Sequence, residues 1–340
     1  MRLGMVCYAT SQGLGYLAKS FYDAGLVTDV MVFRHPHGDR PSHMEWYPKD
    51  TIELTRRPFV GEKIERWLDD LDAVLFFETP FDWKFPGRCR ERGVKTVIIP
   101  MYEWFLENPP HKFDLFINPS LLDQDYFPEG VFIPIPAPQG TWKQRTVAQR
   151  FLHNAGNIGC RGHKGTLELL QALEFVESPI SLTIRAQDRR GLRNLLAKLP
   201  KRVVEDPRLG IVAGEIPYES LFLGDYDVYI APEKFNGLSL PLQEAFASGM
   251  LVMTTDRYPT NTWLPKEPLI PALGTSKART CNGHLQFDEC TIDPRTIAKT
   301  IDYWWNCSIA HFSNAGLTYS QENSWEVLKP RYTAAIEGIL

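Results

Sequence analysis

A glycine-rich loop carries the first residues that could do chemistry. Residues 156–165 read Gly-Asn-Ile-Gly-Cys-Arg-Gly-His-Lys-Gly, with a strand predicted before them and a helix predicted to begin at Thr166. Glycine lets a backbone approach a phosphate closely, and a helix N-terminus presents unpaired N–H groups to it. Arg161 and Lys164 would neutralise a diphosphate. The alternative is an ordinary strand-to-helix turn whose cations face solvent.

A second segment combines a buried strand, a loop and a helix. The strand is predicted at residues 228–231, and the helix begins near Pro241, a residue that suits a first helical turn. We place Glu244 in that first turn, where its carboxylate can accept hydrogen bonds from both hydroxyls of a ribose. Backbone N–H groups near Ser239 and Leu240 would face a phosphate.

This segment resembles the nucleotide-sugar signature of GT-B glycosyltransferases of family 4, whose usual form is E-G-F-G-L-P-x-x-E-A-x-A-x-G-x-P-V. The matching positions are Gly237, Leu240, Pro241, Glu244, Ala245, Ala247, Gly249 and Val252. The resemblance implies that the loop formed by Asn236, Gly237, Leu238, Ser239 and Leu240 binds the donor, together with Glu244.

Three further segments resemble the same family. Lys164-Gly165 is similar to the end of its phosphate loop, and Gly13-Leu14-Gly15 is similar to the glycine loop of its N-terminal domain. Ser324-Trp325-Glu326 resembles its closing motif. The resemblance therefore assigns Gly13 and Gly15 to the binding site.

Two positions depart from the family pattern. The first glutamate of the signature, which supports the transferred sugar or its reaction, falls on Asn236, which we retain as a candidate catalytic residue. Glu233 is nearby but out of register. The phosphate-binding arginine of the family falls on Asn157, and Arg161 is the candidate to replace it.

The resemblance implies an α/β protein of GT-B fold, with two Rossmann-like, doubly wound parallel-sheet domains facing a cleft. We expect an acceptor domain at residues 1–138, with a C-terminal helix at 320–340 packing back on it, and a nucleotide-sugar-binding domain at 139–319. The implied activity is sugar transfer with retention of configuration from a nucleotide sugar, a UDP-sugar rather than a GDP-sugar. No obligatory cofactor is expected.

The loop variant at residues 236–241, with D-R-Y-P-T-N-T-W-L-P at 256–265, resembles a subgroup found in tailed bacteriophages. Some phage glycosyltransferases modify hydroxymethylated pyrimidines in DNA, so the resemblance implies DNA as one acceptor. A glycan or protein acceptor is an alternative. So are a GT-B-shaped epimerase or phosphorylase and a catalytically degenerate protein that only binds nucleotide sugars.

Two carboxylates of the first half, Glu78 and Glu103, each follow a predicted buried strand. Strand carboxyl ends face the ligand crevice of an open α/β sheet. Either residue could bind an acceptor hydroxyl or take its proton, and both are candidate catalytic residues. The alternative is a helix cap or a surface carboxylate.

The predicted elements alternate between strand and helix twice along the chain, separated by the proline-rich residues 133–138. Such alternation predicts two parallel α/β domains with continuous apolar strands. The strands are expected at 3–8, 29–33, 73–77, 96–100, 114–118, 151–155, 181–185, 209–213, 228–231 and 251–254, and helices at 16–24, 88–92, 166–176, 240–247 and 325–339.

Composition indicates an ordinary globular protein, with 44% hydrophobic and 23% charged residues. The net charge is −5 over residues 1–140 and +1 over residues 141–340, so a polyanion would have to meet a local patch. Six cysteines without metal-ligand spacing predict reduced thiols in a cytoplasm and no metal site. No apolar run is long enough to span a membrane. The candidate basic patch comprises Arg34, Arg40, Arg56, Arg57, Arg88 and Arg92.

Overall fold

The computed structural model describes residues 1–34, 42–156, 162–217, 222, 224–279 and 286–340. The chain divides into two compact units. Unit 1 comprises Met1–Pro136, Arg279–Gln286 and Trp325–Leu340, and unit 2 comprises Ala137–Ala278 and Phe287–Ser324.

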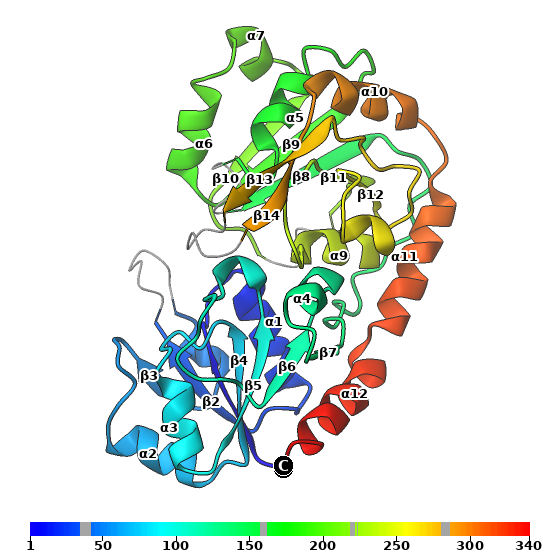
Figure 1. Ribbon diagram of the computed structural model, residues 1–340. Coiled ribbons are helices and arrows are strands. Elements are labelled where there is room, and N and C mark those ends of the chain that lie inside the picture. The colour runs from blue at the N-terminus through cyan, green and yellow to red at the C-terminus, as the bar shows by residue number, and fades with distance from the viewer. Residues whose placement is uncertain (35–41, 157–161, 218–221, 223, 280–285) are drawn as a thin grey trace. The chain divides into compact units, whose positions relative to one another are not determined.

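Unit 1 is built on a seven-stranded sheet in the order β3-β2-β1-β4-β5-β6-β7, with every pairing parallel. The first strand lies inside the sheet, and the chain winds outward from it in one direction and then in the other (Figure 1). Between β1 and β4 the winding direction reverses, which is where ligands bind in open α/β sheets. The strands are β1 (Leu3–Cys7), β2 (Asp29–Phe33), β3 (Ile52–Leu54), β4 (Ala73–Glu78), β5 (Lys95–Pro100), β6 (Leu115–Asn118) and β7 (Val131–Phe132).

The last helix of the chain packs on unit 1. In α12 (Trp325–Glu337), the Lys329 ammonium donates to the Ala24 carbonyl at 2.7 Å, and the Tyr332 hydroxyl donates to the Pro134 carbonyl at 3.1 Å. The Trp325 ring meets Phe21 of α1 edge to face. The other helices of unit 1 are α1 (Gly13–Asp23), α2 (Glu62–Asp69), α3 (Phe85–Glu91) and α4 (Leu121–Tyr126).

Unit 2 repeats this arrangement with five parallel strands in the order β10-β9-β8-β11-β12. Its reversal of winding falls between β8 and β11. The strands are β8 (Arg150–Gly156), β9 (Ser181–Ala186), β10 (Leu209–Ala213), β11 (Val228–Ala231) and β12 (Leu251–Thr254). A separate pair, β13 (Gly274–Arg279) and β14 (Gln286–Thr291), follows β12 in the sequence.

Both faces of the unit 2 sheet are covered. In β11, Val228 and Ile230 pack into one buried cluster with residues of α5 and α10, whereas Tyr229 and Ala231 pack into another with residues of α9. This explains why β11 is an uninterrupted apolar run. The helices are α5 (Thr166–Ala172), α6 (Arg189–Leu196), α7 (Lys201–Val204), α9 (Leu240–Ala247), α10 (Pro294–Trp304) and α11 (Ala310–Glu322).

The predicted parallel strands are all present, most within one residue of their expected ends. Helix boundaries differ more: α1 begins three residues before the predicted Tyr16, α3 begins at Phe85, and α5 ends at Ala172 rather than at 176. The pattern missed the short strands β3 and β7, the pair β13 and β14, and several helices, including α2, α10 and α11.

Candidate functional site

The reversal point of the unit 2 sheet brings together the loops that the sequence singled out. The loop after β8 leads to α5, and the loop after β11 leads to α9. Within the described residues the two loops touch: the Lys234 amide donates to the His163 carbonyl at 2.7 Å. Gly165 adopts a left-handed conformation (φ 67°) as the N-cap of α5, where its backbone packs on Pro232. Lys164 therefore lies beside the loop that follows β11.

A buried charged cluster occupies this junction. Glu233 is fully buried, and its Oε2 accepts a hydrogen bond from Nη2 of Arg257 at 3.1 Å. The Lys164 ammonium lies 4.0 Å from Oε1 of Glu233. Arg257 follows β12 as Glu233 follows β11, so the carboxyl ends of three neighbouring strands supply the cluster. Two cations therefore share one carboxylate at the edge of the sheet where ligands bind.

Two side chains fix the loop that precedes α9. Ser239 is the N-cap of α9 and has a positive φ of 44°, an unfavourable conformation for a residue with a side chain. Its amide donates to Oδ1 of Asn236 at 2.9 Å, and its hydroxyl donates to Glu233 Oε1 at 3.0 Å. Asn236 therefore uses its amide oxygen within the loop. Gly237 and Leu238 are buried in this loop, and Leu240 is the first residue of α9.

Glu244 lies in the second turn of α9, not in the first as the sequence suggested. It is the fifth residue of the helix and is buried. The predicted bounds of this helix, 240–247, are confirmed, but a turn holds about 3.6 residues, so its fifth residue falls outside the first turn. Burial and the nearby carboxylates of Glu233 and Glu244 raise the pKa of the Tyr229 hydroxyl. The two glutamates therefore lie around one buried tyrosine.

A buried histidine ties the start of α5 to the sheet. Nδ1 of His153 lies 2.7 Å from the Ile230 carbonyl oxygen, and Nε2 lies 2.9 Å from Oγ1 of Thr166, the first residue of α5. A carbonyl can only accept, so Nδ1 carries the proton and Nε2 accepts from the threonine hydroxyl. Burial is the main cause that lowers the pKa of His153 to about 4, so its ring is neutral at neutral pH.

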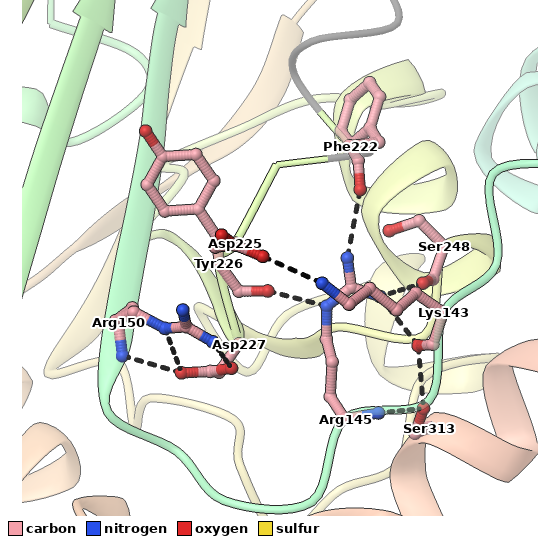
Figure 2. Close-up of polar contacts among 9 residues, drawn as sticks. All are labelled: Lys143, Arg145, Arg150, Phe222, Asp225, Tyr226, Asp227, Ser248 and Ser313. Carbon is pink, nitrogen blue, oxygen red and sulfur yellow. Dashed lines mark hydrogen bonds and ion pairs between the residues drawn. The ribbon is translucent and has the colours of Figure 1, made fainter.

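An arginine anchors the opposite end of α9 (Figure 2). The Arg145 guanidinium donates to the backbone carbonyls of Lys143 at 2.9 Å, Phe222 at 3.0 Å and Tyr226 at 2.6 Å, and also to that of Ser248, the C-cap of α9. Burial lowers its pKa to about 10, which leaves it charged at neutral pH. A cation at this end also interacts favourably with the helix dipole.

Neither buried anchor was predicted from the sequence. His153 sits within an apolar strand, where a single histidine carries no distinguishing spacing, and Arg145 precedes that strand in a loop. Arg257 was also missed, although it lies within the segment 256–265 that the sequence comparison singled out. The sequence signal that could have identified Arg257 is its position, because it is a charged residue that closely follows a buried strand. Arg161 lies outside the described residues.

In unit 1, one of the two predicted glycines, Gly15, has a packing role. Gly13 begins α1, and Gly15 lies in its first turn. A Cβ on Gly15 would stand 2.1 Å from the Thr10 carbonyl oxygen. The helix therefore approaches the end of β1 closely because Gly15 has no side chain.

Glu78 and Glu103 lie in one acidic cluster at the carboxyl ends of β4 and β5. Burial, and secondarily the charge of Glu103, raises the pKa of Glu78 to about 8. Burial and Glu103 likewise raise the pKa of Asp123 to about 8, although its carboxylate accepts from the Tyr102 amide at 3.1 Å. Glu78 has a positive φ of 64°. At neutral pH the Glu78 carboxyl is therefore mostly protonated. In this form it can donate a hydrogen bond but cannot act as a base.

Three of the six arginines in the candidate basic patch of unit 1 are engaged in ion pairs. Arg34 pairs with Glu53 at 2.8 Å, and Arg92 pairs with Glu65 at 2.9 Å. Arg88 also pairs with Glu65. Arg57 lies over the ring of Phe33, and Arg40 lies outside the described residues.

The described residues contain no group of three or more His, Cys, Asp or Glu side chains that could hold a metal ion. No helix among them is long and apolar enough to cross a membrane.

No family model matches the chain, and no curated protein sequence matches it. Its structure, however, matches solved structures over nearly the full length of both chains. The match to HepE of Anabaena, solved with UDP and glucose, has a TM-score of 0.71 at 12% identity and covers 99% of this chain and 100% of that one. The fold is GT-B.

Two other solved structures give the same result. A glycosyltransferase from Rickettsia africae ESF-5 matches with a TM-score of 0.67 at 12% identity, covering 99% of this chain and 98% of that one. Sucrose-phosphate synthase from Thermosynechococcus elongatus matches with a TM-score of 0.66 at 14% identity, covering 100% and 99%. Likeness at this level of identity establishes the fold, and the chemistry has to be argued from the site.

Proposed function

We propose that this chain is a glycosyltransferase that takes a sugar from a UDP-sugar and transfers it to an acceptor hydroxyl. The observation that carries the proposal is the junction at the reversal point of the unit 2 sheet. There a lysine, a helix N-terminus and a buried glutamate on that helix meet at the edge where such sheets bind nucleotides. HepE, of the same fold, has been solved with UDP and with UDP-glucose, which supports the choice of UDP.

In this proposal the diphosphate binds beside Lys164 and the N-terminus of α9 at Leu240, because the Ser239 amide already donates to Asn236. Arg161 is the second proposed cation. Glu244 accepts hydrogen bonds from the ribose hydroxyls. Asn236 shapes the loop through its bond from the Ser239 amide rather than by touching the sugar.

The proposed reaction retains configuration at the anomeric carbon. The bond from that carbon to the diphosphate oxygen breaks, and Lys164 stabilises the charge that develops on the leaving group. The acceptor oxygen forms its bond on the same face, and its proton passes to the departing diphosphate oxygen. No protein nucleophile is required, which agrees with the role given to Asn236.

For the acceptor, we propose that Glu78 and Glu103 contact the hydroxyl that receives the sugar. Glu78 would donate a hydrogen bond at neutral pH because its pKa is raised to about 8. DNA bearing hydroxymethylated pyrimidines is the acceptor that the phage-like loop favours. The ion pairs of Arg34, Arg88 and Arg92 oppose it, because they leave few cations for phosphates.

The experiment is a matrix of donors and acceptors. Purified protein is incubated with each nucleotide sugar and with saccharide, protein and hydroxymethylcytosine- or hydroxymethyluracil-containing duplex acceptors, and products are identified by mass. A hexose or pentose increment on one acceptor class supports transfer. If the protein binds a donor but neither transfers the sugar nor hydrolyses the donor, it is instead a protein that only binds nucleotide sugars. Asn236 motivates this alternative. Binding of no nucleotide sugar at all refutes the proposal.

A further inference from the structure

The ion pair between Glu233 and Arg257 lies against the proposed diphosphate site rather than in a remote part of the core. Glu233 contacts Arg257, the Ser239 hydroxyl and, at 4.0 Å, the Lys164 ammonium. Nη1 of Arg257 donates to the carbonyl of Asn236 at 2.7 Å. The pair therefore touches the lysine proposed to bind phosphate and both residues that hold the N-cap of α9.

The arginine of this pair is not saturated by protein partners. Its Nε is buried without a hydrogen-bond partner among the described residues. Its side chain is only 5% exposed, so this N–H group has lost water without gaining an acceptor, which is costly. Lys164, beside it, has one carboxylate at long range. The neighbouring His163 adds no charge, since burial and these two cations lower its pKa to about 3.

The same residues differ together from the family signature. The signature has glutamate at the position of Asn236 and glycine at the position of Ser239. Here the serine hydroxyl binds Glu233, and Glu233 binds Arg257. In this chain the carboxylate near that position is therefore Glu233, three residues earlier than Asn236, and its partner is an arginine.

We propose that Arg257 is a further diphosphate-binding cation of the donor site and that Glu233 is the positioning residue that holds Arg257 and Lys164 in the absence of ligand. This inference rests on the proposed function. The charge of Glu233 opposes an incoming diphosphate, and that of Arg257 attracts it. The balance between them sets how strongly the site prefers a nucleoside diphosphate over the uncharged nucleoside.

The test is a charge series measured with two probes, UDP and uridine. R257M removes one positive charge, E233Q removes one negative charge, and E233Q/R257M removes both and restores the wild-type balance. The ratio of UDP affinity to uridine affinity should fall about tenfold or more in R257M and should not fall in E233Q, which loses a repelling charge. In the double variant the ratio should lie between those of R257M and wild type, because the charge balance returns but the Arg257 contact does not. Uridine affinity should change little throughout.

A purely structural ion pair predicts a different pattern. In that case each single variant would either lower the affinities for UDP and uridine together or lower the affinity ratio to the same extent as the other. The affinity ratio of the double variant would not rise above that of R257M. Either of these two patterns overturns the proposal. Thermal unfolding of each protein identifies a variant that fails to fold. The Arg257 charge is tested twice, by R257M against wild type and by E233Q/R257M against E233Q, so one comparison still decides if a protein of the other fails to fold. Wild-type protein that binds no UDP refutes the proposed function instead.

Discussion

Gly165 packs so closely on Pro232 that a Cβ on Gly165 would stand 2.0 Å from the Pro232 carbonyl oxygen. The loops that follow β8 and β11 therefore meet backbone to backbone, and this contact places Lys164 beside Glu233. Glycine is required at position 165 for two reasons. A Cβ would clash with Pro232, and φ is positive at 67°.

The first prediction concerns this contact. Gly165→Ala should separate the two loops, and UDP affinity measured by calorimetry should fall about tenfold or more, since Lys164 moves with the loop. Gly140→Ala is the matched control, because Gly140 has a similar φ of 73° but nothing within 4 Å of an added Cβ. Both variants should lose about 1–2 kcal/mol of stability from the left-handed conformation. Equal UDP affinity in the two variants would contradict the role of the contact.

Glu244→Gln tests the ribose assignment. The substitution keeps the shape of the side chain and removes charge-assisted hydrogen bonds worth about 1.5–3 kcal/mol, so UDP affinity should fall about tenfold or more. The loss should shrink when the ligand is 2′-deoxy-UDP, which lacks one of the two hydroxyls. A loss of the same size with both ligands would show that Glu244 acts on the fold of α9 and not on the ribose.

Arg145 should be among the most sensitive positions for the stability of unit 2. Arg145→Met leaves four backbone carbonyls without their charged donor and should lower the free energy of unfolding by about 3–5 kcal/mol, measured by chemical denaturation. Lys143→Met is the control: both members of its pair with Asp225 are exposed, so its loss should change stability far less. A small effect of Arg145→Met would mean that water replaces the guanidinium.

His153 predicts a loss of stability on the acid side. Its folded pKa of about 4 lies below its ordinary value of 6.5, so the unfolded chain takes up a proton that the folded chain refuses. The contribution of His153 to the free energy of unfolding should be complete above pH 6.5 and should fall by on the order of 3 kcal/mol as the pH drops to 4. His153→Gln should flatten this part of the curve, with His163 leaving a residual slope. An unchanged slope would refute the assignment.

Glu78 predicts the opposite dependence. Its folded pKa of about 8 lies above its ordinary value of 4.5, so the folded chain holds a proton that the unfolded chain releases. The contribution of Glu78 to the free energy of unfolding should therefore fall as the pH rises from 4.5 through 8. Glu78→Gln should be stabilised relative to wild type at pH 8 and not at pH 4.5, while Asp123 keeps part of the slope. Equal effects of the substitution at both pH values would argue against the raised pKa.

The sequence by itself determined the parallel strands and the loop that leads into α9. A strand that is buried on both faces, such as β11, needs apolar residues at every position, so its sequence alone predicts its burial. The Gly237-to-Val252 register fixed the identity and length of α9 because proline and glycine mark its two ends. Glu244 was identified by that register, although its turn of the helix was not.

Only the tertiary structure brought Glu233, Lys164 and Arg257 together, since they follow three different strands and no spacing in the chain links them. The same holds for His153 and Arg145, whose partners lie far away in sequence at Ile230 and Ser248. The partners of a buried polar group decide its role, and in a parallel sheet these partners come from strands that are far apart in the sequence. Sequence patterns therefore predicted the elements, whereas the strand order decided which charges share a site.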